Sequence, residues 1–258
     1  MTLFWNKTLI LTVALVLPAA LQAQCRATST SQSVALIELY TSEGCDSCPP
    51  ADRWLSGLKL GVGGGNAAAL AFHVDYWDRL GWKDRFANAA FTQRQYEQAS
   101  RRHSDLVYTP QILVQGRDFD GWRHGAPTAQ IAAINARPAR AVIELGVEQS
   151  PPGSALVDLR VRVPQARDRA HTAIAVALTQ SELTSDVGAG ENAGKRLAHD
   201  NVVRAWEAGL ALGAGGELQR SIRWTLPQEQ GPLSVVALAE DTSTGEVLQA
   251  LSLPLCLP

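Results

Sequence analysis

The sequence predicts an α/β domain followed by an antiparallel, all-β sandwich. In the N-terminal half, short apolar runs alternate with segments of helical spacing, as in domains whose helices pack on a central sheet. In the C-terminal half, apolar residues recur at every second position and turn residues separate the runs. A chain of 258 residues is long enough for two domains, and we place them at residues 24–138 and 139–258.

Composition narrows the class of protein. The chain is 46% hydrophobic and 19% charged, which is typical of a folded globular protein. Its formal net charge of −2 gives no basic field for nucleic acid, so we expect no nucleic-acid partner. No stretch approaches the roughly 20 apolar residues of a membrane-spanning helix. No dimerisation segment is evident, and we expect a monomer.

Residues 1–23 have the pattern of a secretory signal peptide. Lys7 is their only charge, residues 9–17 are apolar, and residues 21–23 form a small-residue cleavage site. We therefore expect a periplasmic or secreted protein, which folds in an oxidising compartment.

The N-terminal half is expected to run β-α-β-α-β-β-α. Val34 to Tyr40 is an apolar strand that leads into two cysteines. The following elements are a helix at 51–60, a strand at 67–74, a helix from the Thr92/Gln95 capping box to Arg102, a strand at 111–115, a hairpin partner at 119–123 and a helix at 128–135.

The C-terminal half consists of alternating segments. They centre on residues 143–147, 157–163, 174–178, 222–226, 233–240 and 246–253, and the last two flank a Thr-Ser-Thr-Gly turn. The Gly-rich residues 185–195 do not have phosphate-loop spacing. The chain also has no G-x-S-x-G motif of a serine hydrolase.

Cys45-Asp46-Ser47-Cys48 is the strongest functional signal. A C-x-x-C between a strand and the start of a helix is typical of redox dithiols, because a helix N-terminus stabilises a thiolate. An inert disulfide or half of a copper or zinc site is the alternative. A zinc site needs four ligands and there is no second C-x-x-C, although His73 or His103 could approach. We expect no metal and no cofactor.

Cys25 and Cys256 lie near the two ends of the mature chain. We hypothesise that they form a structural disulfide, and the alternative is two unpaired thiols. Closing so long a loop would stabilise the fold by at most about 5 kcal/mol.

Several motifs together resemble a known family. They are Gly-Cys-Asp-Ser-Cys-Pro-Pro-Ala-Asp at 44–52, His-Val-Asp-Tyr-Trp at 73–77, Gly-Trp-Lys-Asp at 81–84 and Tyr-Thr-Pro-Gln at 108–111. Strand, C-x-x-C, helix and a later Thr-Pro before a strand resemble the thioredoxin arrangement. More narrowly, the chain resembles a bacterial family of secreted thioredoxin-like proteins of unknown function. The resemblance implies a thioredoxin-like α/β domain and redox chemistry.

The resemblance also assigns roles. Cys45 matches the more exposed, attacking cysteine and Cys48 the resolving one. Pro110 matches a cis-proline that faces the dithiol, so that Thr109 presents backbone groups to a bound peptide. Glu38 lies near the position of the buried acid that relays a proton to the resolving cysteine. The alternative for Glu38 is a strand acid that is paired elsewhere.

Tyr76, Trp77 and Trp82 follow the carboxyl end of a predicted strand, where open α/β sheets bind ligands. We interpret them as a substrate-binding lip beside Cys45, with a packed aromatic loop as the alternative.

The charges near the dithiol indicate the direction of electron transfer. Asp46 lies between the cysteines and Glu43 just before them, and negative neighbours raise a thiol's pKa. We therefore expect an exported thiol–disulfide oxidoreductase that reduces rather than oxidises, with a disulfide-containing protein or a small thiol as partner. The alternative functions are a non-enzymatic binding module and a copper- or zinc-handling dithiol protein.

Overall fold

The computed structural model describes residues 1, 24–58, 60, 66–149 and 151–256, so the predicted signal peptide lies outside these residues apart from Met1. The described strands are β1 Gln24–Thr28, β2 Ala35–Thr41, β3 Ala67–His73, β4 Gln111–Val114, β5 Arg117–Asp118, β6 Val142–Gln149, β7 Ser154–Arg162, β8 Thr172–Gln180, β9 Leu183–Asp186, β10 Arg196–His199, β11 Val202–Ala211, β12 Glu217–Thr225, β13 Leu233–Asp241 and β14 Val247–Pro254. The helices are α1 Pro49–Gly57, α2 Ala89–Arg101, α3 Thr128–Asn135 and α4 Ala166–Arg169, with 3₁₀ turns η1 Asp78–Leu80 and η2 Asp120–His124.

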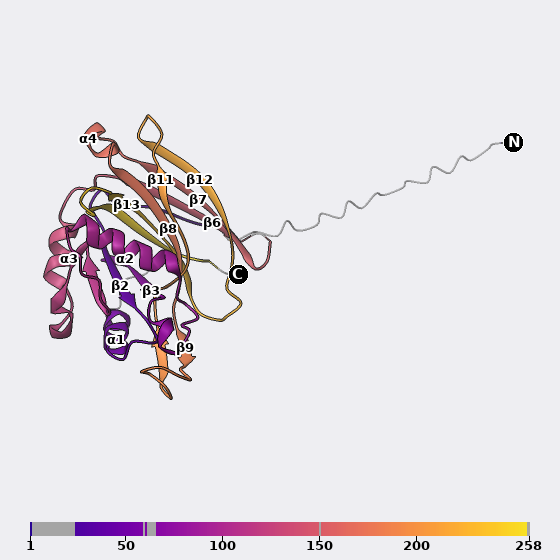
Figure 1. Ribbon diagram of the computed structural model, residues 1–258. Helices are drawn as coiled ribbons and strands as arrows, with labels where there is room; N and C mark the ends of the chain where they lie inside the picture. The colour runs from indigo at the N-terminus through magenta and orange to yellow at the C-terminus, as the bar shows by residue number, and fades with distance from the viewer. Residues whose placement is uncertain (2–23, 59, 61–65, 150, 257–258) are drawn as a thin grey trace.

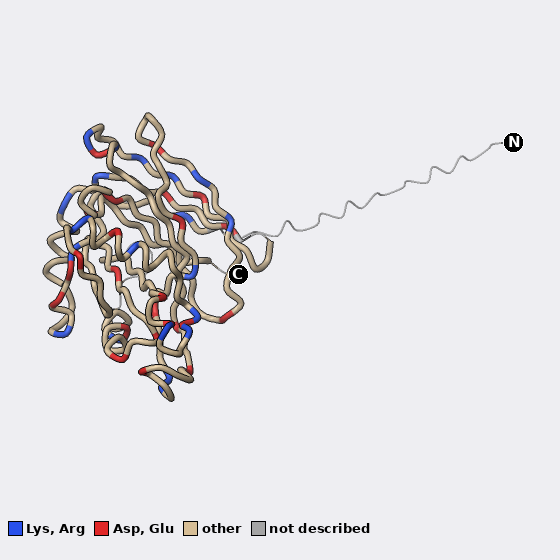
Figure 2. The backbone as a smooth tube through the Cα atoms, viewed as in Figure 1, with Lys and Arg blue, Asp and Glu red and all other residues tan. Residues whose placement is uncertain are grey.

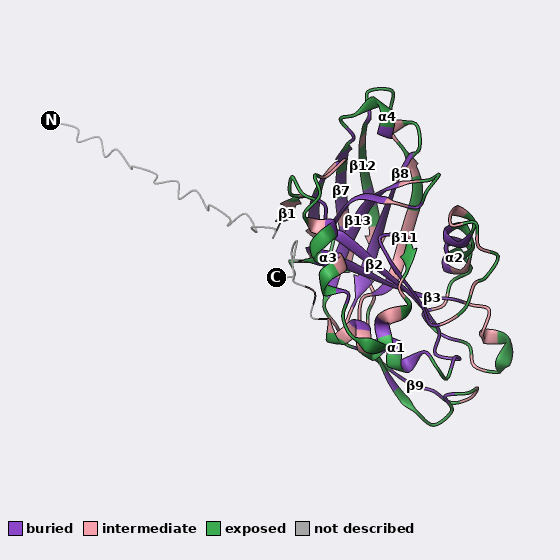
Figure 3. Ribbon diagram, turned by 90° about the vertical axis from the view of Figure 1, so that its left-hand side faces the viewer, coloured by how far each residue is buried: buried purple, intermediate pink, exposed green. Residues whose placement is uncertain are grey.

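An eight-stranded sheet of order β14-β13-β8-β11-β3-β2-β4-β5 forms the centre of the molecule (Figure 1). A four-stranded sheet, β1-β6-β7-β12, packs against part of it, and β9 pairs with β10 in a separate hairpin. Figures 1 and 3 both place β9 at the same end of the molecule as α1. The hairpin therefore lies near the helix that follows the cysteines.

The predicted fold class is wrong. The chain is mostly β-sheet, and strands from its two halves form one sheet instead of a thioredoxin-like α/β fold followed by an all-β fold. The joining strand is β11, which pairs in parallel with β3 at Val202 and Ala71 and antiparallel with β8. The backbone N of Ala71 donates to the carbonyl O of Asn201 at 2.8 Å. The boundary near residue 138 stays a prediction, since no observation tests it.

β2 and β3 are buried along their whole lengths because both faces of the sheet are covered there. They are parallel and in register from Ala35 opposite Ala67 to Thr41 opposite His73. Ile37 and Leu39 pack with α1 and α3, whereas Leu36 and Tyr40 pack with Phe91 of α2. α1 and α2 therefore lie on opposite faces of the sheet, with β2 between them.

The C-terminal strands form a sandwich with the four-stranded sheet. Ile174, Val176 and Leu178 of β8 pack against Leu159 and other inward residues of that sheet. Ala175 and Ala177 point the other way, into the cluster that contains Phe91. The four-stranded sheet and α1 thus share one face of the large sheet, and Figure 3 shows α2 on the opposite side.

Several local predictions differ from the structure at their boundaries, and α2 and β5 are two examples. α2 begins at Ala89, with the Asn88 side chain accepting from the Ala90 N–H, so the helix starts one turn before the expected capping box. The expected partner strand at 119–123 is instead the two-residue β5 followed by the η2 turn. In both cases the local pattern identified the region but not the residue at which the element begins.

The structure joins Cys25 to Cys256 by a disulfide, with 5.8 Å between the two Cα atoms. This bond connects β1 to the segment after β14, and it spans 231 positions of the chain. Basic and acidic residues are interspersed over the described part of the molecule (Figure 2). Within the residues that the structure describes, no helix has the length and apolar character needed to cross a membrane.

Candidate functional site around the Cys45–Cys48 disulfide

Cys45 and Cys48 form a disulfide between the end of β2 and the start of α1, with 5.4 Å between their Cα atoms. The backbone N of Cys48 donates to the carbonyl O of Cys45 at 3.2 Å, which closes a turn around the two intervening residues. Cys48 is the N-cap residue of α1, and Pro49 occupies the first turn, where its missing N–H is tolerated. Cys48 nevertheless has helical backbone angles, although a following proline disfavours them.

The peptide bond between Thr109 and Pro110 is cis. Ser47, from between the cysteines, lines one cavity of about 210 Å³ together with Thr109 and Pro110. The same cavity is lined by the aromatic side chains of Phe119 and Trp122. The structure therefore brings the dithiol turn and the Thr-Pro turn to a common surface depression.

Both cysteines are buried at 0% exposure, which differs from the expectation that Cys45 would be exposed. The two residues between them, Asp46 and Ser47, are exposed. The Oγ atom of Ser47 lies 3.4 Å from the Sγ atom of Cys45. A single side chain, Ser47, thus links the buried sulfur to the open cavity.

The three aromatic residues of the predicted lip separate into two groups. Trp77 donates from Nε1 to Oγ1 of Thr109 at 2.7 Å, and Trp82 donates from Nε1 to Oε2 of Glu43 at 2.8 Å. Tyr76 instead donates to Oε1 of Gln95 on α2, and burial raises its pKa to about 12. Trp77 and Trp82 therefore border the dithiol loop, whereas the Tyr76 hydroxyl bonds Gln95 of α2 and also lies beside Thr109.

Glu38 does not lie at the dithiol. Its neighbours Ile37 and Leu39 pack with α1, so the Glu38 side chain points to the opposite face. There its Oε1 lies 2.7 Å from Nε of Arg94, which also pairs with Glu240 at 3.1 Å. The assignment of Glu38 as a proton relay is corrected: this acid neutralises a buried arginine. The cause is the register of β2, which directs residue 38 away from α1.

A different set of buried ionisable residues lies behind the dithiol loop. Nδ1 of His73 is 2.7 Å from Oδ2 of Asp84, and that carboxylate also accepts from the backbone N of Glu43 at 2.9 Å. Burial disfavours the charged forms of both His73 and Asp84. Their mutual attraction outweighs burial, so the pKa of His73 is raised and that of Asp84 is lowered. A carboxylate thus clamps the residue two positions before Cys45.

Glu43 faces His199 of β10. Oε1 of Glu43 lies 3.4 Å from Nε2 of His199, although the alignment does not make a hydrogen bond. Burial opposes ionisation of Glu43, but the His199 imidazole together with the side chains of Ser185 and Trp82 outweighs it, and the carboxyl pKa is lowered. The rings of His73 and His199 are 5.0 Å apart, so the two histidines belong to one buried cluster.

Asp52 lies one helical turn after Cys48 on α1, and its backbone N donates to the Cys48 carbonyl O at 3.1 Å. Its Oδ2 accepts from Oγ1 of Thr41 at 3.2 Å. Burial raises the pKa of Asp52, and the nearby His199 and His73 act in the opposite direction. Asp52 of α1, unlike Glu38, therefore lies on the dithiol side of the sheet.

The β9–β10 hairpin closes over the loop before the cysteines. Nδ2 of Asn192 donates to the carbonyl O of Glu43 and to that of Cys45, both at 2.8 Å. The backbone N of Asp46 donates to Oε2 of Glu191 at 3.1 Å. The C-terminal half of the chain therefore contributes to the dithiol environment.

The sequence did not indicate Asn192 or Glu191, because they lie in a Gly-rich turn 147 and 145 positions from their partners. His73, named above as a residue that could approach a metal, is a buried histidine in contact with Asp84. His199 was not distinguished from other histidines in β segments. Its alternation with buried Leu197 on β10 was the available signal.

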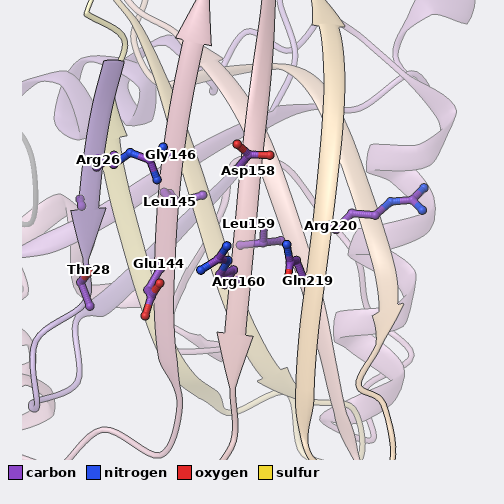
Figure 4. Close-up of a pocket in the computed structure, with 11 residues that line it drawn as sticks. Arg26, Thr28, Glu144, Leu145, Gly146, Asp158, Leu159, Arg160, Gln219 and Arg220 are labelled. Carbon is purple, nitrogen blue, oxygen red and sulfur yellow. The ribbon is translucent and has the colours of Figure 1, made fainter. Parts of the chain in front are cut away.

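In the part of the chain that the structure describes, no group of three or more His, Cys, Asp and Glu side chains is arranged to hold a metal ion. A shallow cavity of about 210 Å³ lies on the outer face of the four-stranded sheet (Figure 4). Its charges are of both signs, from Arg160 and Arg220 to Glu144 and Asp158, and none of its lining residues comes from the dithiol loop.

Comparisons with known proteins identify a family and similar structures but no reaction. A family model described as "Protein of unknown function (DUF1223)" matches residues 36–239. A crystal structure of an Agrobacterium tumefaciens protein is similar, with 24% identity, a TM-score of 0.58 and coverage of 87% of this chain and 96% of that one. HBP35 of Porphyromonas gingivalis is 15% identical with a TM-score of 0.60, over 87% of this chain and 76% of its own. No curated protein matches the chain.

Proposed function

We propose that this chain, which belongs to the DUF1223 family of proteins of unknown function, is an exported thiol–disulfide oxidoreductase that acts through Cys45 and Cys48. The observation that carries the proposal is the cavity in which Ser47, from between the two cysteines, meets Thr109 and Pro110. A partner seated in that cavity would lie one side chain away from the Cys45 sulfur. The resemblance lies in the motifs at 44–52 and 108–111 and not in the fold, and it adds the roles of the two cysteines.

The proposed step transfers electrons through sulfur bonds alone. In the reducing direction, the Cys45 thiolate attacks one sulfur of a partner disulfide, and the other partner sulfur leaves as a thiolate. Cys48 then attacks the Sγ of Cys45, releases the partner as a second thiol and closes the Cys45–Cys48 disulfide. The partner gains two electrons and two protons, which the dithiol loses.

The charges around the loop favour the reducing direction. Glu43 lies just before the cysteines, Glu191 accepts from the Asp46 N–H, and Asp52 follows one turn after Cys48. Three carboxyl groups disfavour a thiolate, while the N-terminus of α1 favours one by about 0.3–1 kcal/mol. A poorly stabilised thiolate makes the disulfide the preferred state and the dithiol a reductant.

Access is the point on which a second candidate function depends. Both sulfurs are covered, and this favours a non-enzymatic binding module in which the disulfide only fixes the loop. In the redox proposal, the exposed Ser47 side chain moves aside when a partner binds. The partner is a disulfide-containing protein or a small thiol, and the two disulfides of the structure are compatible with an exported protein.

Insulin reduction tests the proposal on the mature protein. With dithiothreitol as electron source, the wild type should accelerate insulin reduction, and Cys45→Ser should abolish the acceleration while leaving the fold intact. The matched control is the double variant Cys25→Ser/Cys256→Ser, which removes the other disulfide and should retain turnover. Equal rates for wild type and Cys45→Ser would favour the binding module.

A further inference from the structure

Asn192 is a fully buried polar residue at the turn of the β9–β10 hairpin. Its Oδ1 accepts from Nζ of Lys195 at 2.8 Å. Because an ammonium group can only donate, this contact fixes which end of the amide carries the oxygen. The Nδ2 end therefore faces the dithiol loop, where it donates to the carbonyls of Glu43 and Cys45.

One of these acceptors also closes the turn between the cysteines. The Cys45 carbonyl O accepts from the Cys48 backbone N at 3.2 Å and from Asn192 Nδ2 at 2.8 Å. Its orientation decides how the Cys45 backbone faces Cys48, and hence how close the two sulfurs are held. Asn192 thus contacts the group that sets the geometry of the dithiol.

The rest of the hairpin turn supports this placement. Glu191 Oε2 accepts from the Asp46 N–H, so two successive hairpin residues bond the loop on both sides of Cys45. A Cβ atom added at Gly190 would lie 3.2 Å from Cβ of Trp82, and Trp82 itself bonds Glu43. The hairpin turn, Trp82 and the cysteine loop are therefore packed as one unit.

We propose that Asn192 is a positioning residue for the Cys45–Cys48 dithiol: it holds the Cys45 carbonyl so that the two sulfurs stay within bonding distance and the disulfide is favoured. The proposal rests on the function proposed above and deepens it, since it makes the C-terminal half part of the redox site. Two thiols held in the right geometry react as if at very high concentration, and loosening that geometry lowers the advantage. Loss of Asn192 should therefore make the disulfide easier to reduce.

The test is the equilibrium of the mature protein with glutathione. Two glutathione thiols reduce the Cys45–Cys48 disulfide to two thiols and become glutathione disulfide, so electrons and protons balance. Alkylation and mass spectrometry give the reduced fraction in each buffer. Asn192→Ala should shift the equilibrium constant toward the dithiol by about fivefold or more, as expected for the loss of a buried hydrogen bond. Lys195→Met should shift it in the same direction and by less, because the amide then loses the contact that holds its Oδ1 end.

The matched control is Arg196→Met, which removes a neighbouring charge whose hydrogen bond stays within the hairpin. Arg196→Met should leave the Cys45–Cys48 equilibrium constant unchanged. In the Asn192→Ala sample, the equilibrium constant of the Cys25–Cys256 disulfide should also be unchanged. A folded Asn192→Ala protein with the wild-type constant would overturn the proposal. If that variant does not fold, the exposed Lys195→Met decides, and an unchanged constant there overturns the proposal equally. Dithiothreitol buffers replace glutathione if the wild type stays oxidised. If the proposed redox function is wrong, the wild type will not accelerate insulin reduction. The shift in the equilibrium constant caused by Asn192→Ala can still be measured in that case.

Discussion

Asp84 accepts two hydrogen-bonding contacts through one oxygen, Oδ2: from the His73 ring at 2.7 Å and from the backbone N of Glu43 at 2.9 Å. His73 ends β3, and Glu43 precedes the cysteines, so this carboxylate ties the sheet to the dithiol loop. All three residues are buried. A charge pair is thus part of the support of the cysteine turn, which makes its stability dependent on pH.

The sign of that dependence follows from the two pKa shifts. The pKa of His73 is raised, so its contribution is fully present below its ordinary value of 6.5 and is lost as pH rises through the raised folded value. The pKa of Asp84 is lowered, so its contribution is present above its ordinary value of 3.8 and is lost as pH falls through the lowered one. Asp84, Asp52 and Glu43 are the charges that raise the pKa of His73.

Above pH 6.5, loss of the His73 proton should weaken its pairing with Asp84. The free energy of unfolding of the wild type should fall as pH rises above 6.5, and His73→Asn should remove this slope because an amide does not titrate. Denaturant unfolding between pH 6 and pH 9 measures it. Parallel curves for the two proteins would show that His73 is not the titrating group.

If reductants reach the Cys45 sulfur past Ser47, two substitutions of Ser47 should change the rate of reduction in opposite directions. Ser47→Ala removes the hydroxyl that contacts the Cys45 sulfur and should speed reduction by dithiothreitol. Ser47→Leu adds bulk where the cavity meets the disulfide and should slow it, by about tenfold in either direction if the approach limits the rate. Stopped alkylation at timed intervals gives the rates. Identical rates for the two variants would mean that the reductant reaches the sulfur elsewhere.

Substitution of Arg94, on the face of the sheet opposite α1, should lower the stability of the fold without changing the redox equilibrium of the dithiol. Arg94→Met leaves Glu38 buried without its ion-pair partner and Glu240 with Arg101 alone, which should cost about 3–5 kcal/mol of unfolding free energy. The Cys45–Cys48 equilibrium with glutathione should be unchanged, because Glu38 points away from α1. Glu38→Gln is the companion variant. A changed equilibrium constant in folded Glu38→Gln would restore Glu38 to the dithiol site.

Removal of the Cys25–Cys256 disulfide should also lower stability without abolishing the proposed redox activity. The double variant Cys25→Ser/Cys256→Ser opens a loop of 231 positions and should lose up to about 5 kcal/mol of stability. Thermal unfolding measures the loss. Unfolding at the wild-type temperature would mean that the bond does not restrain the unfolded chain.

Much of the N-terminal fold could be predicted because its signals are local. The apolar run at 34–40 and the cysteines at a strand-to-helix corner need only neighbours in sequence to be interpreted, and β2 and α1 lie there. Helix α3 also begins and ends at the expected residues, 128 and 135. The cis Thr109–Pro110 bond was expected only from the family resemblance.

The fold class and half of the site could not be predicted because they depend on pairings distant in sequence. β11 has no clean alternation, since five of its ten residues are half-buried, and yet it joins the two halves into one sheet. Glu38 was misplaced because one residue of register reverses the face of a strand. Asn192 meets Cys45 only after the hairpin folds back, and no local pattern encodes that contact.

The proposed function requires that the Cys45–Cys48 disulfide opens and closes reversibly in the folded protein. Its most direct test is the redox titration of the mature wild type in glutathione and dithiothreitol buffers, with circular dichroism to follow the fold. A reversible two-electron transition on the reducing side of the range of exported dithiols is the expected result. A disulfide that stays intact in every buffer until the protein unfolds, or a potential near that of the most oxidising periplasmic dithiols, would contradict it.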